Sequence, residues 1–207
     1  MISDDIFQYL TSALVVVSIF SIIANRIYPI IKWSQPYRLI FLIIPSLLAL
    51  IPIAGISAAR MLLSLNHSYS IGLTILLLVF IINKFFKVLL LSHRDSLYLS
   101  IFNIILGFIL YTTSLGFISY DIYYAGYNFW PLFFIISVLI IILVLGGSRL
   151  QWVFIAYILG WNMKFIPSPN FFDYLIDPLL FFISTGVVAS YMIKFARNTG
   201  ITGGNRL

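Results

Sequence analysis

The chain has 207 residues and a mass of 23.6 kDa; 62% of its residues are hydrophobic and only 9% are charged, against about 25% in a soluble domain. This composition excludes a soluble globule. The chain contains no Cys, which excludes a disulfide framework, a cysteine-ligated metal site and a thiol nucleophile. It also contains no Glu, so Asp supplies all of its acidic side chains. The net charge of +6 does not indicate nucleic-acid binding, because the basic residues are scattered in short connections between apolar segments.

A bilayer core about 30 Å thick needs roughly 20 apolar residues of helix. Seven apolar segments are candidates for such spans, and Pro, Gly and charged residues mark their ends: 7–25, 39–57, 69–83, 97–119, 130–146, 150–166 and 178–192. The sixth segment is short and carries Asn162 and Lys164, which leaves a re-entrant hairpin as an alternative to a full span.

The start of the seventh segment is well defined. Asp177 is a favoured N-cap residue, and Pro178 after it suits the first position of a helix. Ser168 and Pro169 repeat this signal upstream, so we expect a short interfacial helix before the last span.

The distribution of Lys and Arg decides between six and seven spans, since cytoplasmic loops carry an excess of these residues. With seven spans and an external N-terminus, only Arg60 and Lys164 lie outside. The other ten are then cytoplasmic: Arg26, Lys32, Arg38, Lys84, Lys87, Arg94, Arg149, Lys194, Arg197 and Arg206. A re-entrant sixth segment reduces this ten-to-two ratio to eight to four, so the pattern favours seven spans.

The sequence therefore predicts an all-α polytopic membrane protein with seven transmembrane helices, an external N-terminus and a cytoplasmic C-terminus. We expect one helical domain over 1–207, with a flexible polar tail at 198–207. The predicted location is the plasma membrane, as a multi-pass protein of the bacterial inner-membrane kind.

Two features predict how the helices pack. Pro45 and Pro52 are expected to kink or break the second helix. Small residues four apart allow helices to approach closely, either within the chain or with a membrane partner or a second copy. These pairs are Ala54/Ala58, Gly55/Ala59 and Gly186/Ser190.

Acidic and aromatic residues gather in the predicted external connections. They could form a vestibule that binds a cation, a sugar or a lipid head group, or they could be an aromatic belt with helix caps. The candidate binding residues are Asp121, Asp173, Asp177, Tyr120, Tyr123, Tyr124, Trp130 and Lys164.

On the cytoplasmic side, Lys84 and Lys87 are three residues apart and are expected on one helical face. They either extend to the membrane interface or contact an anion. His67 and His93 fall on opposite sides of the membrane, so they cannot share a metal or a haem. We therefore predict no metal site, no cofactor and no catalytic residue.

These patterns leave three functions open. The first is a non-catalytic membrane subunit, or an assembly or binding partner of an envelope complex. The second is a small-solute or ion transporter or channel, and the third is an intramembrane enzyme acting on a lipid or glycan. The expected partners are the lipid bilayer and a membrane protein or second copy at the small-residue helix faces, without nucleic acid.

Overall fold

The structure is a computed structural model, and it describes residues 2–53 and 55–198. Within these ranges the regular elements are helical, and the only β pairing is an isolated bridge between Ile53 and Ile56. The elements are α1 (Ile2–Ile27), η1 (Ile30–Lys32), α2 (Gln35–Leu50), α3 (Ala58–Leu65), α4 (Ile71–Phe86), α5 (His93–Ser114), η2 (Ile122–Tyr127), α6 (Phe129–Leu145), α7 (Gln151–Asn162), α8 (Phe172–Leu175) and α9 (Pro178–Asn198).

Three helices are long and apolar enough to cross a membrane. They are the part of α1 over Asp5–Ile27, then α5 and α9. Three shorter apolar helices, α2, α4 and α6, have 16 or 17 residues. An all-helical membrane protein is thus supported, with three candidate spans among the described residues.

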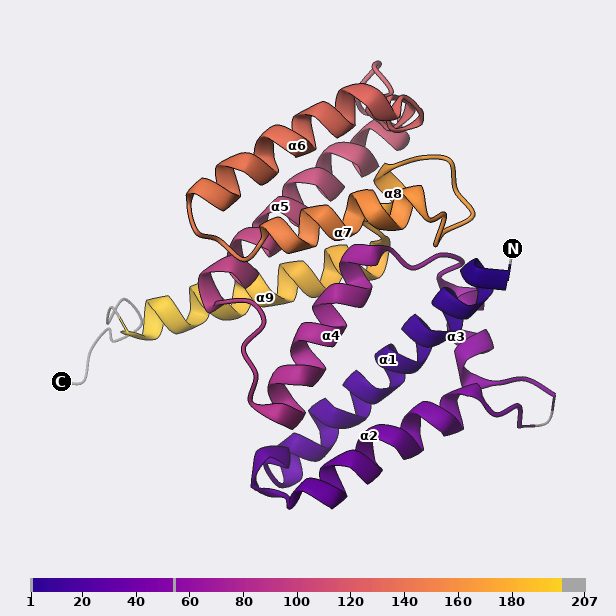
Figure 1. The fold of residues 1–207 in the computed structure, drawn as a ribbon, viewed down its shortest axis with the longest axis vertical. Coiled ribbons are helices and arrows are strands. Elements are labelled where there is room, and N and C mark those ends of the chain that lie inside the picture. The colour runs from indigo at the N-terminus through magenta and orange to yellow at the C-terminus, as the bar shows by residue number, and fades with distance from the viewer. Residues whose placement is uncertain (1, 54, 199–207) are drawn as a thin grey trace.

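The helices form two groups joined by α4 (Figure 1). On one side, α1 packs against α2 and α3; on the other, α5 packs against α9 and α6 packs against α7. Helix α4 contacts α1 on one side and α7, α8 and α9 on the other. The main apolar core lies around α4 and includes Leu73, Tyr157 and Leu180, while Val17, Ile30, Ile81 and Phe85 form a smaller cluster between α1 and α4.

Serine residues begin three of the helices. Ser57 and Ser70 accept hydrogen bonds from backbone N–H groups in the first turns of α3 and α4. Ser92 does the same for α5 and forms a reciprocal capping box with Asp95. These caps satisfy backbone donors that would otherwise have no partner at a helix end.

The second helix is shorter than predicted. Pro45 lies within α2, but the helix ends at Leu50, before Pro52, and Gly55 turns the chain with a φ of 87°. The predicted single span over 39–57 was therefore wrong in its last turns. For the same reason, Gly55 and Ala59 do not share a helix, and Ala54 of the other pair lies outside the described residues.

The remaining apolar segments coincide with helices, with shifted ends. The segment 150–166 is helical only over Gln151–Asn162 in α7, and the short helix predicted after Pro169 is the single turn of α8. The last helix extends to Asn198, so the first residue of the predicted tail is helical. The rest of that tail, 199–207, lies outside the described residues.

Candidate functional site

Asp177 connects three parts of the chain at the start of α9. The residue is 4% exposed. Oδ1 accepts a hydrogen bond from the Leu180 N–H at 3.0 Å and from the Asn66 amide at 3.3 Å. Oδ2 accepts from the Ser70 N–H at 2.8 Å and from the Ser70 hydroxyl at 2.6 Å. The predicted N-cap is confirmed, and this residue also holds the beginning of α4.

A second polar contact joins α1 to the same place. Gln8 of α1 accepts from the Tyr69 N–H at 2.7 Å and donates to the Tyr69 carbonyl at 3.3 Å. One turn further along α1, the hydroxyls of Thr11 and Thr74 are 2.9 Å apart. The ends of α1, α4 and α9 are therefore held together by a buried hydrogen-bond network.

The environment of Asp177 shifts its titration. Burial raises the pKa of the carboxyl above its usual value, and the hydrogen bonds from Ser70 and Leu180 act in the opposite direction. A carboxylate that accepts four hydrogen bonds from its own chain has little remaining capacity for an external cation. Its position thus supports a structural role.

Asp173 belongs to a separate junction. Tyr123 donates its hydroxyl to both carboxylate oxygens of Asp173, at 2.9 and 3.0 Å. Burial, followed by the charge of Asp173, raises the pKa of Tyr123. The Asn170 amide donates to the Tyr123 carbonyl at 2.9 Å, and the Phe171 N–H donates to the Gly126 carbonyl at 2.9 Å. These contacts fix η2 against the segment that precedes α9.

Asp121 has a third, local role. Its side chain accepts a hydrogen bond from the Tyr123 N–H at 3.0 Å and begins η2. The neighbouring aromatic residues Tyr120, Tyr124 and Trp130 are all exposed. The structure thus uses each of the three predicted carboxylates to hold a turn or a helix end. Tyr123 links two of them, because its N–H donates to Asp121 and its hydroxyl donates to Asp173.

Lys164 borders a cavity of about 460 Å³ just after α7. It has a φ of 54°, and the cavity wall also includes Trp161, Asn162 and Tyr174. The Tyr174 hydroxyl donates to the carbonyls of Ile166 at 2.6 Å and Ser168 at 3.2 Å. The wall of this cavity contains none of the three predicted carboxylates, so the predicted site residues do not form one site.

The two lysines at the end of α4 do not share a helical face. Lys84 lies in the last turn, half-buried, with its amine 6.0 Å from the centre of the Phe80 ring. The helix ends at Phe86, and Lys87 follows in a left-handed conformation with a φ of 59°. The expected shared face was wrong because the helix ends before Lys87.

Lys84 instead lines a cavity of about 230 Å³ between α4, α5 and α9. Asn83, His93, Ser96 and Ser100 are the other polar residues of its wall. His67 is not part of this wall; it lies in the connection between α3 and α4, before the start of α4. Among the described residues, no three His, Cys, Asp or Glu side chains are grouped as a metal site would require.

The sequence did not identify the polar partners Gln8, Asn66 and Asn170. Each acts on a residue at least 47 positions away, and its own neighbours in the chain carry no sign of that contact. Ser70 was recognisable, because a serine directly before an apolar run is typical of a helix start.

Comparisons of the chain with protein-family models, curated proteins and solved structures found no match.

Proposed function

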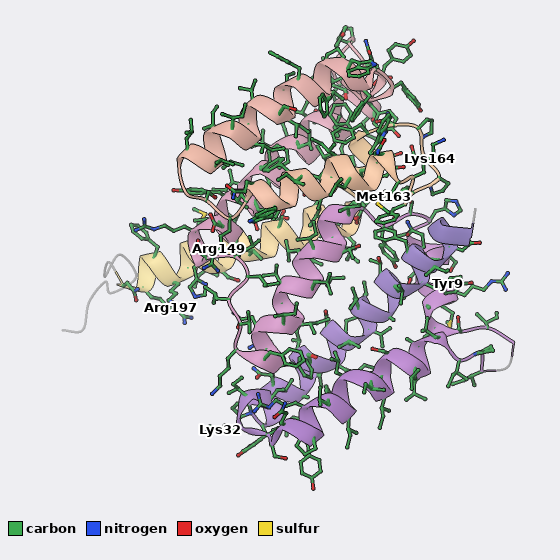
Figure 2. The ribbon with its side chains drawn as sticks, viewed as in Figure 1. Tyr9, Lys32, Arg149, Met163, Lys164 and Arg197 are labelled. Atoms are coloured by element: carbon green, nitrogen blue, oxygen red, sulfur yellow. The ribbon has the colours of Figure 1, made fainter. Side chains whose placement is uncertain are left out.

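We propose that the chain crosses the membrane seven times through α1, α2, α4, α5, α6, α7 and α9, with its N-terminus outside, as a plasma-membrane protein of the bacterial inner-membrane kind. In Figure 1 these helices run alternately towards one side of the molecule and back, and α4 is inclined more steeply than α6, α7 and α9. Figure 2 places Lys32, Arg149 and Arg197 toward the end of the bundle opposite to Lys164. This agrees with a basic cytoplasmic end and an external end poor in Lys and Arg.

Within this topology we propose that the protein is a non-catalytic membrane subunit that binds a partner through α9. The observation that carries the proposal is the open face of this helix. Only 11% of the residues in its most apolar 18-residue stretch are buried, against 44% for α1. Gly186 and Ser190 are exposed on it, and a Cβ added at Gly186 would meet nothing within 4 Å. Small residues at this spacing allow the backbone of another helix to approach closely.

The use of the predicted external carboxylates supports the same proposal. Asp173 and Asp177 accept hydrogen bonds from the chain itself, and Asp121 caps η2. A transporter with an acidic vestibule needs such groups to be available to its solute. Here they hold the connections in place.

Extraction from native membranes in a mild detergent tests the subunit role. We expect the chain to purify with a stoichiometric partner, and we expect Gly186→Leu to lose it because the added side chain separates the two helices. Val138→Leu, at an exposed position of α6, is the matched control and should retain the partner. Purification as the 23.6 kDa chain alone would contradict the proposal.

Solute transport is the second candidate, and one observation favours it. Between α5 and α9 the fully buried Asn103 donates to the Ser184 hydroxyl at 3.1 Å, while its side-chain oxygen has no hydrogen-bond partner in the structure. Buried polar groups inside a helix bundle often mark a solute path. Flux into vesicles containing the purified chain alone, lost in Asn103→Leu, would support transport in place of the subunit role.

A further inference from the structure

We propose that the cavity between α4, α5 and α9 binds the phosphate group of an amphipathic phosphate ester. Phosphate esters of this class include anionic membrane lipids and lipid-linked phosphates. The cavity does not include the exposed Gly186 and Ser190 of α9, and the proposal does not depend on the subunit role, but the assignment to a lipid rests on the proposed seven-span topology.

The cavity has a polar end and an apolar interior. Lys84 and Asn83 lie in the last turn of α4, and His93 is the first residue of α5. These polar groups therefore lie where α4 ends and α5 begins. Further along the same two helices the wall is formed by Leu76 and Leu99. A ligand that fits this arrangement carries charge at one end and hydrocarbon at the other.

Lys84 gives the polar end a positive charge. The lining of this cavity includes Lys84 and His93 and contains no carboxylate. A neighbouring cavity of about 290 Å³ shares His93 and adds Lys194 and Tyr191, again without a carboxylate. The Tyr191 hydroxyl donates to the His93 carbonyl at 2.7 Å, which fixes the start of α5 against α9.

Asp95 is the carboxylate nearest to His93 in the sequence, but other groups hold it. Its Oδ2 accepts from the Ser92 N–H at 3.2 Å and from the Ser92 hydroxyl at 2.8 Å. Its Oδ1 accepts from the Ser148 hydroxyl at 2.7 Å. Asp95 is therefore committed to the start of α5 and to the α6–α7 connection, and the positive charge of the cavity remains available for an anion.

The position of the cavity favours phosphate on a lipid. It lies at the ends of α4 and α5 that the basic-residue pattern assigns to the cytoplasmic interface, where phosphate head groups are found. Basic pockets between transmembrane helices on that side bind such groups. The ring of Phe80, 6.0 Å from the Lys84 amine, lies at the distance of a cation–π contact and helps to position the amine at the polar end.

Binding of short-chain phosphatidic acid to the purified chain in phosphatidylcholine nanodiscs tests the proposal. We expect saturable binding that Lys84→Gln weakens about tenfold or more, because a charge-assisted contact to phosphate is lost. Lys84→Arg keeps the charge and should bind nearly as well as the native chain. Lys87→Gln is the matched control: Lys87 is exposed and outside the cavity, so its substitution should leave the affinity unchanged.

A second pair of variants separates the lipid from free phosphate. Val187→Phe, on the apolar wall, should abolish lipid binding, whereas Val188→Phe, outside the wall, should not. Inorganic phosphate that binds as tightly as the lipid, in both native chain and Val187→Phe, would keep the phosphate site but assign it to a soluble ligand. Absence of binding by both probes, or equal losses in Lys84→Gln and Lys87→Gln, would overturn the proposal. Thermal unfolding of each variant confirms that it is folded.

Discussion

At the scale of single residues, Asp177 connects more of the chain than any other predicted site residue. It is the N-cap of α9 and also holds Ser70, which is itself the N-cap of α4. The sequence predicted the first role, because Asp before Pro is a local signal. The second role depends on a contact across 107 positions, and such a contact has no local signal.

We expect Asp177→Ala to destabilise the protein by about 1–3 kcal/mol, because the buried N–H and hydroxyl of Ser70 and the half-buried amide of Asn66 lose their acceptor. Asp177→Asn keeps one acceptor oxygen and should cost less. Unfolding in mixed micelles, followed by circular dichroism, measures both. Asp121→Asn is the control, since this residue caps only an exposed turn. Equal stability of Asp177→Ala and the native chain would contradict the role of this junction.

The same residue gives the stability a pH dependence. Burial raises the pKa of Asp177 in the folded state, so the folded chain holds this proton more tightly than the unfolded chain. The stabilisation that results is present at low pH and is lost as the pH rises through the folded-state pKa. The Asp177→Asn variant should lack this decline. A parallel slope in both chains would show that the carboxyl titrates as in the unfolded chain.

At the scale of elements, the sequence predicted helices better than their connections. Apolar runs located the seven helices α1, α2, α4, α5, α6, α7 and α9, although α7 has only 12 residues. A run of apolar residues favours a helix in lipid, because a helix satisfies its own backbone hydrogen bonds. It failed at the end of α2, where Gly55 and Pro52 produce a turn in a stretch that is still apolar. Hydropathy alone does not distinguish a helix from a turn in such a stretch.

The contact between η2 and the segment before α8 gives a test at this scale. A Cβ at Gly126 would overlap the side-chain oxygen of Asn170, which accepts from the Phe172 N–H at 2.9 Å and so is not free to move. Gly126→Ala should cost about 1–3 kcal/mol of stability through this overlap.

Gly186→Ala is the matched control for that substitution. The site lies inside α9 with nothing near it, so alanine should be neutral or stabilising by up to about 1 kcal/mol, measured by the same unfolding assay. If both substitutions have the same effect, the η2 contact is looser than described.

At the scale of the whole molecule, the position of α7 decides the topology. At 12 residues this helix is shorter than the roughly 20 needed to cross the bilayer core. The seven-span proposal places Ser64 and Met163 outside and Asn198 inside, whereas a re-entrant α7 would place Asn198 outside. The chain contains no native Cys, so single cysteines at these exposed positions report their side without interference.

We expect a membrane-impermeant thiol reagent to label Ser64→Cys and Met163→Cys in intact cells, and to label Asn198→Cys only after the membrane is opened. The physical reason is the basic-residue pattern: with seven spans, ten of the twelve Lys and Arg lie in the cytoplasm. In the alternative only eight do, because Lys194, Arg197 and Arg206 move outside and Lys164 moves inside. Labelling of Asn198→Cys in intact cells, with protection of Met163→Cys, would establish the re-entrant form. The re-entrant form would also place the C-terminal end of α9 on the opposite side from the start of α5, although the Tyr191 hydroxyl donates to the His93 carbonyl in the structure, so this contact argues for seven spans.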